Sequence, residues 1–228
     1  MIDHCTMAGG MLKFYSAWFC PYAQRTWIAL NHLKVKYELT ESLKITQDGA
    51  YEKNADLLKL NPKGLVPTLH VPNGEVVVES IDTLEYLNKK YNNESTDFVT
   101  PKLVEEAHKM NKIVCSPFYL ILMKPEESER EEAWHNFTQG LEKFTEGVVD
   151  GGFFNSATHM NIVDVTVFPM AVRLFVLQHY RGKQLDTTQP WVKNFMAWRD
   201  RMLACEAVSA TVAKDAELLE VVGRYVAK

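Results

Sequence analysis

The chain has 228 residues, a formal net charge of −4 and a hydrophobic fraction of 46%. This length fits two modest domains or one large one, and the hydrophobic fraction is sufficient for a sizeable core. The slight negative charge provides no basic surface of the kind that nucleic-acid binding requires. No apolar run approaches the roughly 18 residues that span a membrane. Residues 1–10 lack the apolar core of a signal peptide and are predicted to form a flexible arm.

The four cysteines, Cys5, Cys20, Cys115 and Cys205, show no regular spacing. In a chain of this length without a signal peptide, reduced thiols are favoured over two disulfides. Cys115 and Cys205 are interpreted as structural. The seven histidines show no spacing typical of metal ligands, and we predict no metal site.

The first chemical feature is a cysteine between a predicted strand and a predicted helix. Residues 11–15 alternate apolar and polar side chains, which predicts a short half-buried strand. Apolar residues at Ala23 and Trp27 have helical spacing, and Pro21 suits the first position of that helix. Cys20 is therefore expected at or near the N-cap, where the helix dipole and free N–H groups favour a thiolate. We interpret Cys20 as reactive; the alternative is a small residue that fills space.

The rest of the first eighty residues continues to alternate strands and helices. The predicted order is β-α-β-α-β-β-α, in which helical crossovers make the first strands parallel and a hairpin adds an antiparallel edge. The predicted elements are a strand at 35–39, a polar stretch with Asp48-Gly49, a helix at 55–60, strands at 68–71 and 76–78, and a helix from Ser80 to Tyr91.

Residues 92–101 break this pattern and are predicted to be a linker. No further strand is predicted, and the apolar spacing beyond the linker is helical. We therefore expect an α/β domain at 11–91 and an all-helical domain at 102–228. The predicted helices lie near 102–124, 126–149, 162–179 and 190–204, with room for one more in the last twenty residues.

Three motifs together resemble those of the cytosolic glutathione transferases. They are residues 19–25 (Phe-Cys-Pro-Tyr-Ala-Gln-Arg), residues 61–67 (Asn-Pro-Lys-Gly-Leu-Val-Pro) and Glu79-Ser80. The first is similar to the cysteine-containing signature of the omega class and of the related lambda and dehydroascorbate reductase classes. The resemblance implies a thioredoxin-like glutathione-binding domain followed by an all-α domain, in a cytoplasmic protein. It leaves the oligomeric state open, since omega relatives are dimers and the other two classes are often monomers.

Two of these motifs have a physical reading as a peptide-binding site. Pro67 donates no N–H and suits a sheet edge, while Val66 before it is extended and can offer its N–H and C=O to a peptide backbone. The resemblance implies a cis-proline that pairs with the cysteinyl part of glutathione; the alternative is a turn proline. Ser80 at a helix N-terminus is suited to bind a carboxylate, and Glu79 is suited to bind an ammonium group. The γ-glutamyl end of glutathione carries both of these groups. A plain N-cap is the alternative for Ser80.

Other site residues follow from the resemblance alone. Phe19 is placed in the glutathione site, and Lys53 is similar to the family lysine that reaches the glycyl carboxylate, although a solvent-facing lysine would look the same. On the first long helix of the second domain, Tyr119 and Met123 are one turn apart and are expected to line the second-substrate pocket. Arg173 corresponds to an arginine near that pocket in the omega class. Core packing for the first two, and a helix-surface position for the arginine, are the alternatives.

The resemblance implies thiol chemistry. A cysteine at this position forms a mixed disulfide with glutathione, which a second glutathione resolves. Because position 23 is alanine, there is no C-x-x-C motif, and the second sulfur must come from a bound thiol. The expected activities are thiol transfer, removal of glutathione from mixed disulfides and reduction of dehydroascorbate, with glutathione as cosubstrate and a small electrophile, disulfide or dehydroascorbate as second substrate.

Three alternatives remain open at this point. Tyr15 and Ser16 precede the cysteine, so a conjugating transferase that uses a hydroxyl is conceivable. The same scaffold serves as a partner-binding module in elongation factor 1 gamma, whose relatives usually lack this cysteine motif. The intracellular chloride channel proteins keep a single cysteine, but the first domain shows no hydrophobic segment suited to membrane insertion.

Residues 160–165 carry a folding signal. Asn161 is predicted to cap a helix while Asp164, three residues on, reaches back to the cap's N–H. Met160 and Val165 are placed to form the hydrophobic staple of such a box. The family has a buried capping box at this point, and we predict that Asp164→Ala costs about 1–2 kcal/mol.

Overall fold

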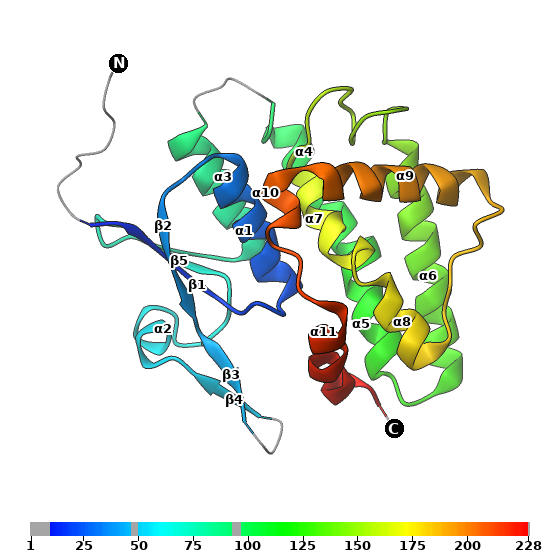
Figure 1. Ribbon diagram of the computed structural model, residues 1–228, viewed down its shortest axis with the longest axis horizontal. Coiled ribbons are helices and arrows are strands. Elements are labelled where there is room, and N and C mark those ends of the chain that lie inside the picture. Colours follow the sequence, from blue (N-terminus) through cyan, green and yellow to red (C-terminus); the bar gives the residue numbers. More distant parts are fainter. Residues whose placement is uncertain (1–9, 47–49, 93–96, 228) are drawn as a thin grey trace. The chain divides into compact units, whose positions relative to one another are not determined.

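The computed structural model describes residues 10–46, 50–92 and 97–227 (Figure 1). The chain divides into two compact units, Met1–Tyr91 and Asn92–Lys228, and each has its own buried apolar core. Most of the predicted arm, and the Asp48-Gly49 pair of the predicted polar stretch, lie outside the described residues.

The first unit is built on a four-stranded sheet in the order β2-β1-β5-β6. β1 (Leu12–Ser16) pairs in parallel with β2 (Tyr37–Glu41) and antiparallel with β5 (Thr68–His70). β6 (Val76–Val78) forms the antiparallel edge beside β5. The parallel pair requires a crossover, which α1 (Pro21–His32) supplies. The predicted thioredoxin-like α/β arrangement is therefore confirmed.

Two details of the predicted strands are wrong. β1 is a central strand rather than a half-buried one: Phe14 and its partner Leu69 on β5 are both fully buried. β2 begins at Tyr37 rather than residue 35, because the chain first completes the end of α1. There Lys34 has φ 53°, and the N–H of Val35 donates to the carbonyl of Leu30 at 2.9 Å.

The stretch predicted as polar loop contains a hairpin. β3 (Leu43–Ile45) and β4 (Tyr51–Lys53) pair antiparallel as a separate two-stranded sheet. α2 (Ala55–Leu60) follows directly, as predicted, and Asn54 caps it by accepting hydrogen bonds from the first-turn N–H groups of Asp56 and Leu57. The hairpin therefore leads the chain from the end of β2 to the start of α2.

Two helices of the first unit pack on one face of its sheet. α1 and α3 (Ser80–Tyr91) lie side by side there, and α2 lies on the other face (Figure 1). The hydroxyls of Thr26 and Thr83, both fully buried, share a hydrogen bond of 2.6 Å between the two helices. This contact fixes the first turn of α3 against α1.

The second unit is helical, as predicted. Its described elements are α4 (Pro101–Met110), a π-helical turn (Asn111–Cys115), α5 (Ser116–Met123), α6 (Glu127–Glu146), α7 (Ile162–Ala171), α8 (Leu174–Arg181), α9 (Pro190–Ala204), α10 (Glu206–Ser209), α11 (Asp215–Val222) and a 3₁₀ turn (Gly223–Tyr225). Two predicted single helices are thus divided: the first by the π-helical turn, and the third between α7 and α8. Between α6 and α7 the described chain forms only isolated β-bridges.

α7 begins with a buried capping box. The N–H of Asn161 donates to the Asp164 carboxylate at 2.9 Å, and the N–H of Val163 donates to the Asn161 side chain. The same carboxylate accepts the N–H of Phe154 at 2.9 Å and the indole N–H of Trp198, on α9, at 2.7 Å. Burial raises the pKa of Asp164 to about 6, although these hydrogen bonds act in the opposite direction.

One helical stretch in the described chain, residues Ile162–Arg181, is long and apolar enough to cross a membrane, which the sequence reading did not anticipate. Of its most apolar part, 72% is buried within the protein. Ten consecutive residues of α7 are buried there, so packing inside the helical unit accounts for the apolar composition.

Candidate functional site

The sheet register brings the three sequence motifs to one end of the first unit. Tyr15, near the end of β1, is opposite Thr68 at the start of β5, and Thr68 is in turn opposite Val78 at the end of β6. The turn after β1, the segment before β5 and the segment after β6 therefore leave the sheet at the same end. These segments carry Cys20, Val66-Pro67 and Glu79-Ser80, respectively.

Cys20 is the N-cap residue of α1, with extended backbone angles (φ −78°, ψ 117°) and proline at the next position. Its N–H donates to the carbonyl of Ala17, and its own carbonyl accepts the N–H of Gln24, so the turn and the helix both hold its backbone. The thiol is half-buried, and its Sγ lies 3.9 Å from the carbonyl oxygen of Val66. The sulfur thus sits at the positive end of a twelve-residue helix.

The Val66-Pro67 peptide bond is cis. The preceding loop is held by Asn61, whose side-chain amide donates to the carbonyl of Leu65 and to the Thr68 hydroxyl, both at 3.1 Å. Val66 itself is half-buried, and Pro67 is buried at the start of β5. The loop therefore presents the Val66 backbone beside the Cys20 sulfur.

Lys53 is exposed, and its side chain lies along this loop. Its ammonium group donates to the carbonyl of Lys63 at 2.8 Å. Gly64 has φ 60°, and a Cβ at this position would lie 2.5 Å from the Cδ of Lys53. The glycine therefore permits both the left-handed backbone and the close approach of the lysine stem.

The Glu79-Ser80 motif forms the beginning of α3. Glu79 is exposed and has φ 64°, a left-handed conformation that is uncommon for a non-glycine residue. Its carbonyl accepts the N–H of Thr83 at 2.9 Å, so it occupies the cap position. Ser80 is buried, and its hydroxyl accepts a hydrogen bond from the Arg25 guanidinium at 3.0 Å. Among the described residues this hydroxyl caps no N–H of α3, which disfavours the plain N-cap reading.

Phe19, next to Cys20 in the chain, is buried. Its ring stacks on Tyr51 of β4, with centroids 5.5 Å apart, and meets Trp18 edge to face. Packing against the unpredicted hairpin therefore fixes the residue just before the cysteine.

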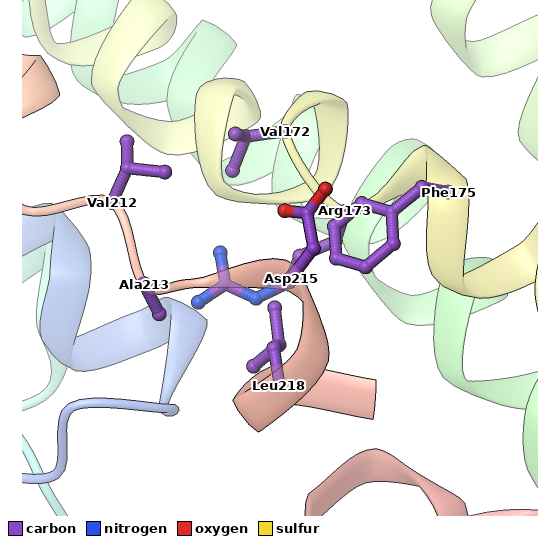
Figure 2. Close-up of a pocket in the computed structure, with 7 residues that line it drawn as sticks. All are labelled: Val172, Arg173, Phe175, Val212, Ala213, Asp215 and Leu218. Carbon is purple, nitrogen blue, oxygen red and sulfur yellow. The ribbon is translucent and has the colours of Figure 1, made fainter. Parts of the chain in front are cut away.

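Of the three residues expected around the second substrate, one lines a pocket in the helical unit. Arg173 is 3% exposed, which is inconsistent with a helix-surface arginine, and its guanidinium donates to the carbonyl of Pro169 at 2.8 Å. Figure 2 shows it between the α7–α8 region and the C-terminal segment. Seven residues line this pocket: Val172, Arg173, Phe175, Val212, Ala213, Asp215 and Leu218.

The other two predicted residues are not among those that line this pocket. Tyr119 is half-buried against the ring of Phe118, with centroids 5.8 Å apart, and Met123 at the end of α5 is 51% exposed.

Two residues near Cys20 were missed by the sequence reading. Glu41, at the end of β2, accepts the backbone N–H of Trp18 with both carboxylate oxygens, at 3.2 and 3.3 Å. Burial raises the pKa of Glu41 to about 7, although this hydrogen bond acts in the opposite direction. Arg25 reaches Ser80 across the α1–α3 interface. Neither contact has a sequence signal, because the partners are far apart in the chain.

Within the described residues, no group of three histidine, cysteine, aspartate or glutamate side chains is placed to hold a metal ion. Of the two remaining described cysteines, Cys205 is half-buried and precedes a helix as Cys20 does, but that helix, α10, has only four residues. Cys115 is buried with its Sγ 3.6 Å from the carbonyl of Thr166, and Cys205 lies between α9 and α10 with its thiol pKa raised by burial.

Comparison with known proteins identifies relatives along most of the chain. The family model for the glutathione S-transferase N-terminal domain matches residues 19–90. Glutathione S-transferase omega-1 of Mus musculus is 30% identical over 174 residues, which cover 74% of this chain and 69% of the relative. The pyrimidodiazepine synthase of Drosophila melanogaster is 27% identical and covers 88% of this chain and 80% of its own.

The fold is similar to that of solved glutathione transferases. The crystal structure of glutathione transferase Omega 3C from Trametes versicolor superimposes with a TM-score of 0.79, covering 96% of this chain and 91% of that one. The sequence identity to that protein is 24%, so this likeness concerns the fold alone.

Proposed function

This chain belongs to the cytosolic glutathione transferase superfamily as an omega-like member, and we propose that it is a glutathione-dependent thiol transferase and dehydroascorbate reductase. The observation that carries the proposal is the position of Cys20. A half-buried thiol caps a proline-initiated helix and lies 3.9 Å from the backbone of Val66, next to a cis-proline. A thiolate at that position is stabilised by the helix N-terminus and is exposed enough to react.

The proposed reaction is two thiol–disulfide exchanges. The Cys20 thiolate attacks the glutathionyl sulfur of a mixed disulfide, a Cys20–glutathione disulfide forms, and the other thiol leaves as a thiolate and takes up a proton. The thiolate of a second glutathione then attacks the glutathionyl sulfur, which releases glutathione disulfide and restores the Cys20 thiolate. With dehydroascorbate, two glutathione thiols supply the two electrons and two protons of the reduction, and Cys20 carries the intermediate disulfide.

The proposed glutathione site uses the end of the sheet where the three motifs meet. The Val66 backbone pairs with the cysteinyl residue of glutathione, and the cis-Pro67 next to it keeps that backbone edge open. Ser80 and the first turn of α3 bind the γ-glutamyl carboxylate while the exposed Glu79 accepts the ammonium group. Lys53 binds the glycyl carboxylate by exchanging its bond to the Lys63 carbonyl for a stronger charged one.

The hydroxyl-based conjugating reaction is less well supported. Tyr15 is 4% exposed and Ser16 is 1% exposed, so neither hydroxyl lies at the surface of the site. The non-catalytic binding-module reading shares the whole scaffold and is distinguished by experiment. Retention on glutathione-agarose together with turnover of a small glutathione mixed disulfide supports the enzyme, and retention without turnover supports the module.

Substitution of Cys20 tests the proposal directly. Cys20→Ser should lose thiol transfer and dehydroascorbate reduction, whereas Cys205→Ser, which changes another half-buried cysteine, should keep both. In the unsubstituted protein, alkylation of Cys20 should reach half its maximal rate at a pH clearly below about 8.5, the pKa of an unperturbed cysteine. An ordinary alkylation profile together with full activity of Cys20→Ser would refute the proposal.

A further inference from the structure

A buried arginine connects the helix of the nucleophile to the helix of the head-group site. Arg25 lies on α1 and is 1% exposed. Its Nη1 donates to the Ser80 hydroxyl at 3.0 Å, and its Cζ lies 4.8 Å from the centre of the Tyr22 ring. The ring face and the hydroxyl together hold the guanidinium in one orientation.

The direction of the Arg25–Ser80 hydrogen bond is fixed by chemistry. A guanidinium has donors and no acceptor, so the serine oxygen must be the acceptor. The serine hydroxyl then keeps its own proton for another partner, and in the described part of the chain no group accepts that proton. A hydroxyl that accepts from a cation is also polarised into a better donor.

The backbone around this hydroxyl is held as firmly as the side chain. The hydroxyl of Thr83 donates to the carbonyl of Ser80 at 2.7 Å, and the same hydroxyl is bonded to Thr26 on α1. The first turn of α3, whose N–H groups favour an anion, therefore has a fixed position relative to Arg25.

We propose that Arg25 is a positioning residue that makes the Ser80 hydroxyl a dedicated donor to an α-carboxylate, and so sets specificity for γ-glutamyl thiols. This inference rests on the proposed function, because it concerns the head-group end of the same site. Arg25 acts through Ser80 without contacting the ligand. The guanidinium is connected to the bound carboxylate through the Ser80 hydroxyl. Because this part of the site has low exposure, the positive charge of Arg25 adds to the preference for an anion.

The test compares two ligands that differ only in the head-group carboxylate. Glutathione and γ-aminobutyryl-cysteinyl-glycine, which lacks the α-carboxylate, are titrated calorimetrically under reducing conditions. The unsubstituted protein should bind glutathione at least about tenfold more tightly, the value of a hydrogen bond to a charged group. Arg25→Met should reduce this preference to about threefold or less while affinity for the analogue changes less than twofold. Arg25→Lys should be intermediate.

The control variant, Lys53→Met, changes the residue proposed to bind the glycyl carboxylate at the other end of glutathione. Lys53→Met should weaken both ligands by the same factor, because both keep the glycyl carboxylate. A purely structural role of Arg25 would do the same, since a distorted site loses affinity for both ligands. The rate of Cys20 alkylation in Arg25→Met should equal that of the unsubstituted protein, which checks that α1 is intact.

A second comparison decides the matter even if Arg25→Met does not fold. In a Ser80→Ala background, Arg25→Lys should have no further effect on the preference, because the two residues act as one unit. The inference would be overturned if Arg25→Met kept the full preference for glutathione over the analogue. It would also be overturned if Arg25→Lys lowered that preference as much in the Ser80→Ala background as in the unsubstituted protein. Neither result would contradict the proposed function. No preference in the unsubstituted protein would remove the head-group site from the proposed function itself.

Discussion

The Asp164 carboxylate, at the residue scale, does more than cap one helix. It accepts the N–H groups of Asn161 and Phe154 and the indole N–H of Trp198, so it connects the chain before α7, α7 itself and α9. All of these contacts are buried. A buried donor that loses its acceptor costs about 1–3 kcal/mol, which makes this residue a junction of the helical unit.

Asp164→Ala should therefore destabilise the protein by about 3 kcal/mol or more, which exceeds the 1–2 kcal/mol expected of a cap alone. Urea unfolding measures the loss. Thr100→Ala, which removes the single cap hydrogen bond of α4 at Leu103, is the control and should cost about 1 kcal/mol. Equal losses in the two variants would reduce Asp164 to an ordinary capping residue.

Glu41 should make stability depend on pH near neutrality. Burial raises its pKa to about 7 from the model-compound value of 4.5, so the folded protein binds this proton more tightly than the unfolded chain. Its stabilising contribution is then fully present below about pH 4.5 and is lost as the pH rises through about 7. The carboxylate is partly buried against the backbone of Trp18, whereas the residue as a whole is exposed, so solvent screening keeps the effect on stability small.

The measurement is the free energy of unfolding from pH 4.5 to 8 for the unsubstituted protein and Glu41→Gln. The unsubstituted protein should lose stability relative to Glu41→Gln over this range. Glu38→Gln, an exposed substitution on the same strand, is the control. If the free energy of unfolding changes with pH equally in Glu41→Gln and in the unsubstituted protein, Glu41 does not cause the pH dependence.

At the residue scale, the features that could be predicted from the sequence are those that depend on neighbouring residues. The Cys20 turn, the Val66-Pro67 segment and the Asn161–Asp164 box were readable because each depends on neighbours within a few residues. The Arg25–Ser80 and Asp164–Trp198 contacts were not readable, because their partners are 55 and 34 positions apart and only tertiary packing unites them.

At the scale of elements, the π-helical turn between α4 and α5 packs closely against a glycine of another helix. A Cβ at Gly140 on α6 would lie 2.3 Å from the carbonyl oxygen of Ile113 in that turn. The widened turn and the missing side chain thus allow the two backbones to approach closely. Apolar periodicity predicted one helix through residues 102–124 because it does not record the missing N–H of Pro117, which leaves the carbonyl of Ile113 without its usual helical donor.

Gly140→Ala should destabilise the protein by about 1–3 kcal/mol, because a backbone carbonyl must move to admit the methyl group. In a helix without such a contact, the same change would stabilise by about 1 kcal/mol. Urea unfolding gives the sign. The neighbouring exposed substitution Gln139→Ala should change stability by less than about 0.5 kcal/mol. If Gly140→Ala is instead more stable than the unsubstituted protein, the π-helical turn can move to admit the methyl group at little cost in free energy.

The β3–β4 hairpin was the element missed outright. Each strand has three residues, with a charged side chain at or next to its centre and no buried position, so the pattern is too short and too polar to distinguish it from a loop. Its role becomes visible only in the contact between Tyr51 and Phe19, where it packs against the residue before the nucleophile.

At the scale of the whole molecule, the described cysteines differ in burial and in the groups around the thiol. Cys20 is half-buried at a helix N-terminus, Cys115 is fully buried, and Cys205 has its pKa raised by burial. Glutathione disulfide should therefore modify a Cys5→Ser variant once, at Cys20, as measured by intact mass and peptide mapping. Additional Cys20→Ser should abolish the adduct. Equally rapid modification of Cys205 would contradict this selectivity.

The segment before α4 determines where members of this family can be recombined. Phe98 was predicted to lie in a linker, yet its ring is fully buried and its carbonyl accepts the N–H of Ile162 at the start of α7. It is thus a core residue of the helical unit that precedes the first helix. A chimaera joined at residue 101 would exchange this ring for a relative's, whereas a junction at residue 92 transfers the helical core whole.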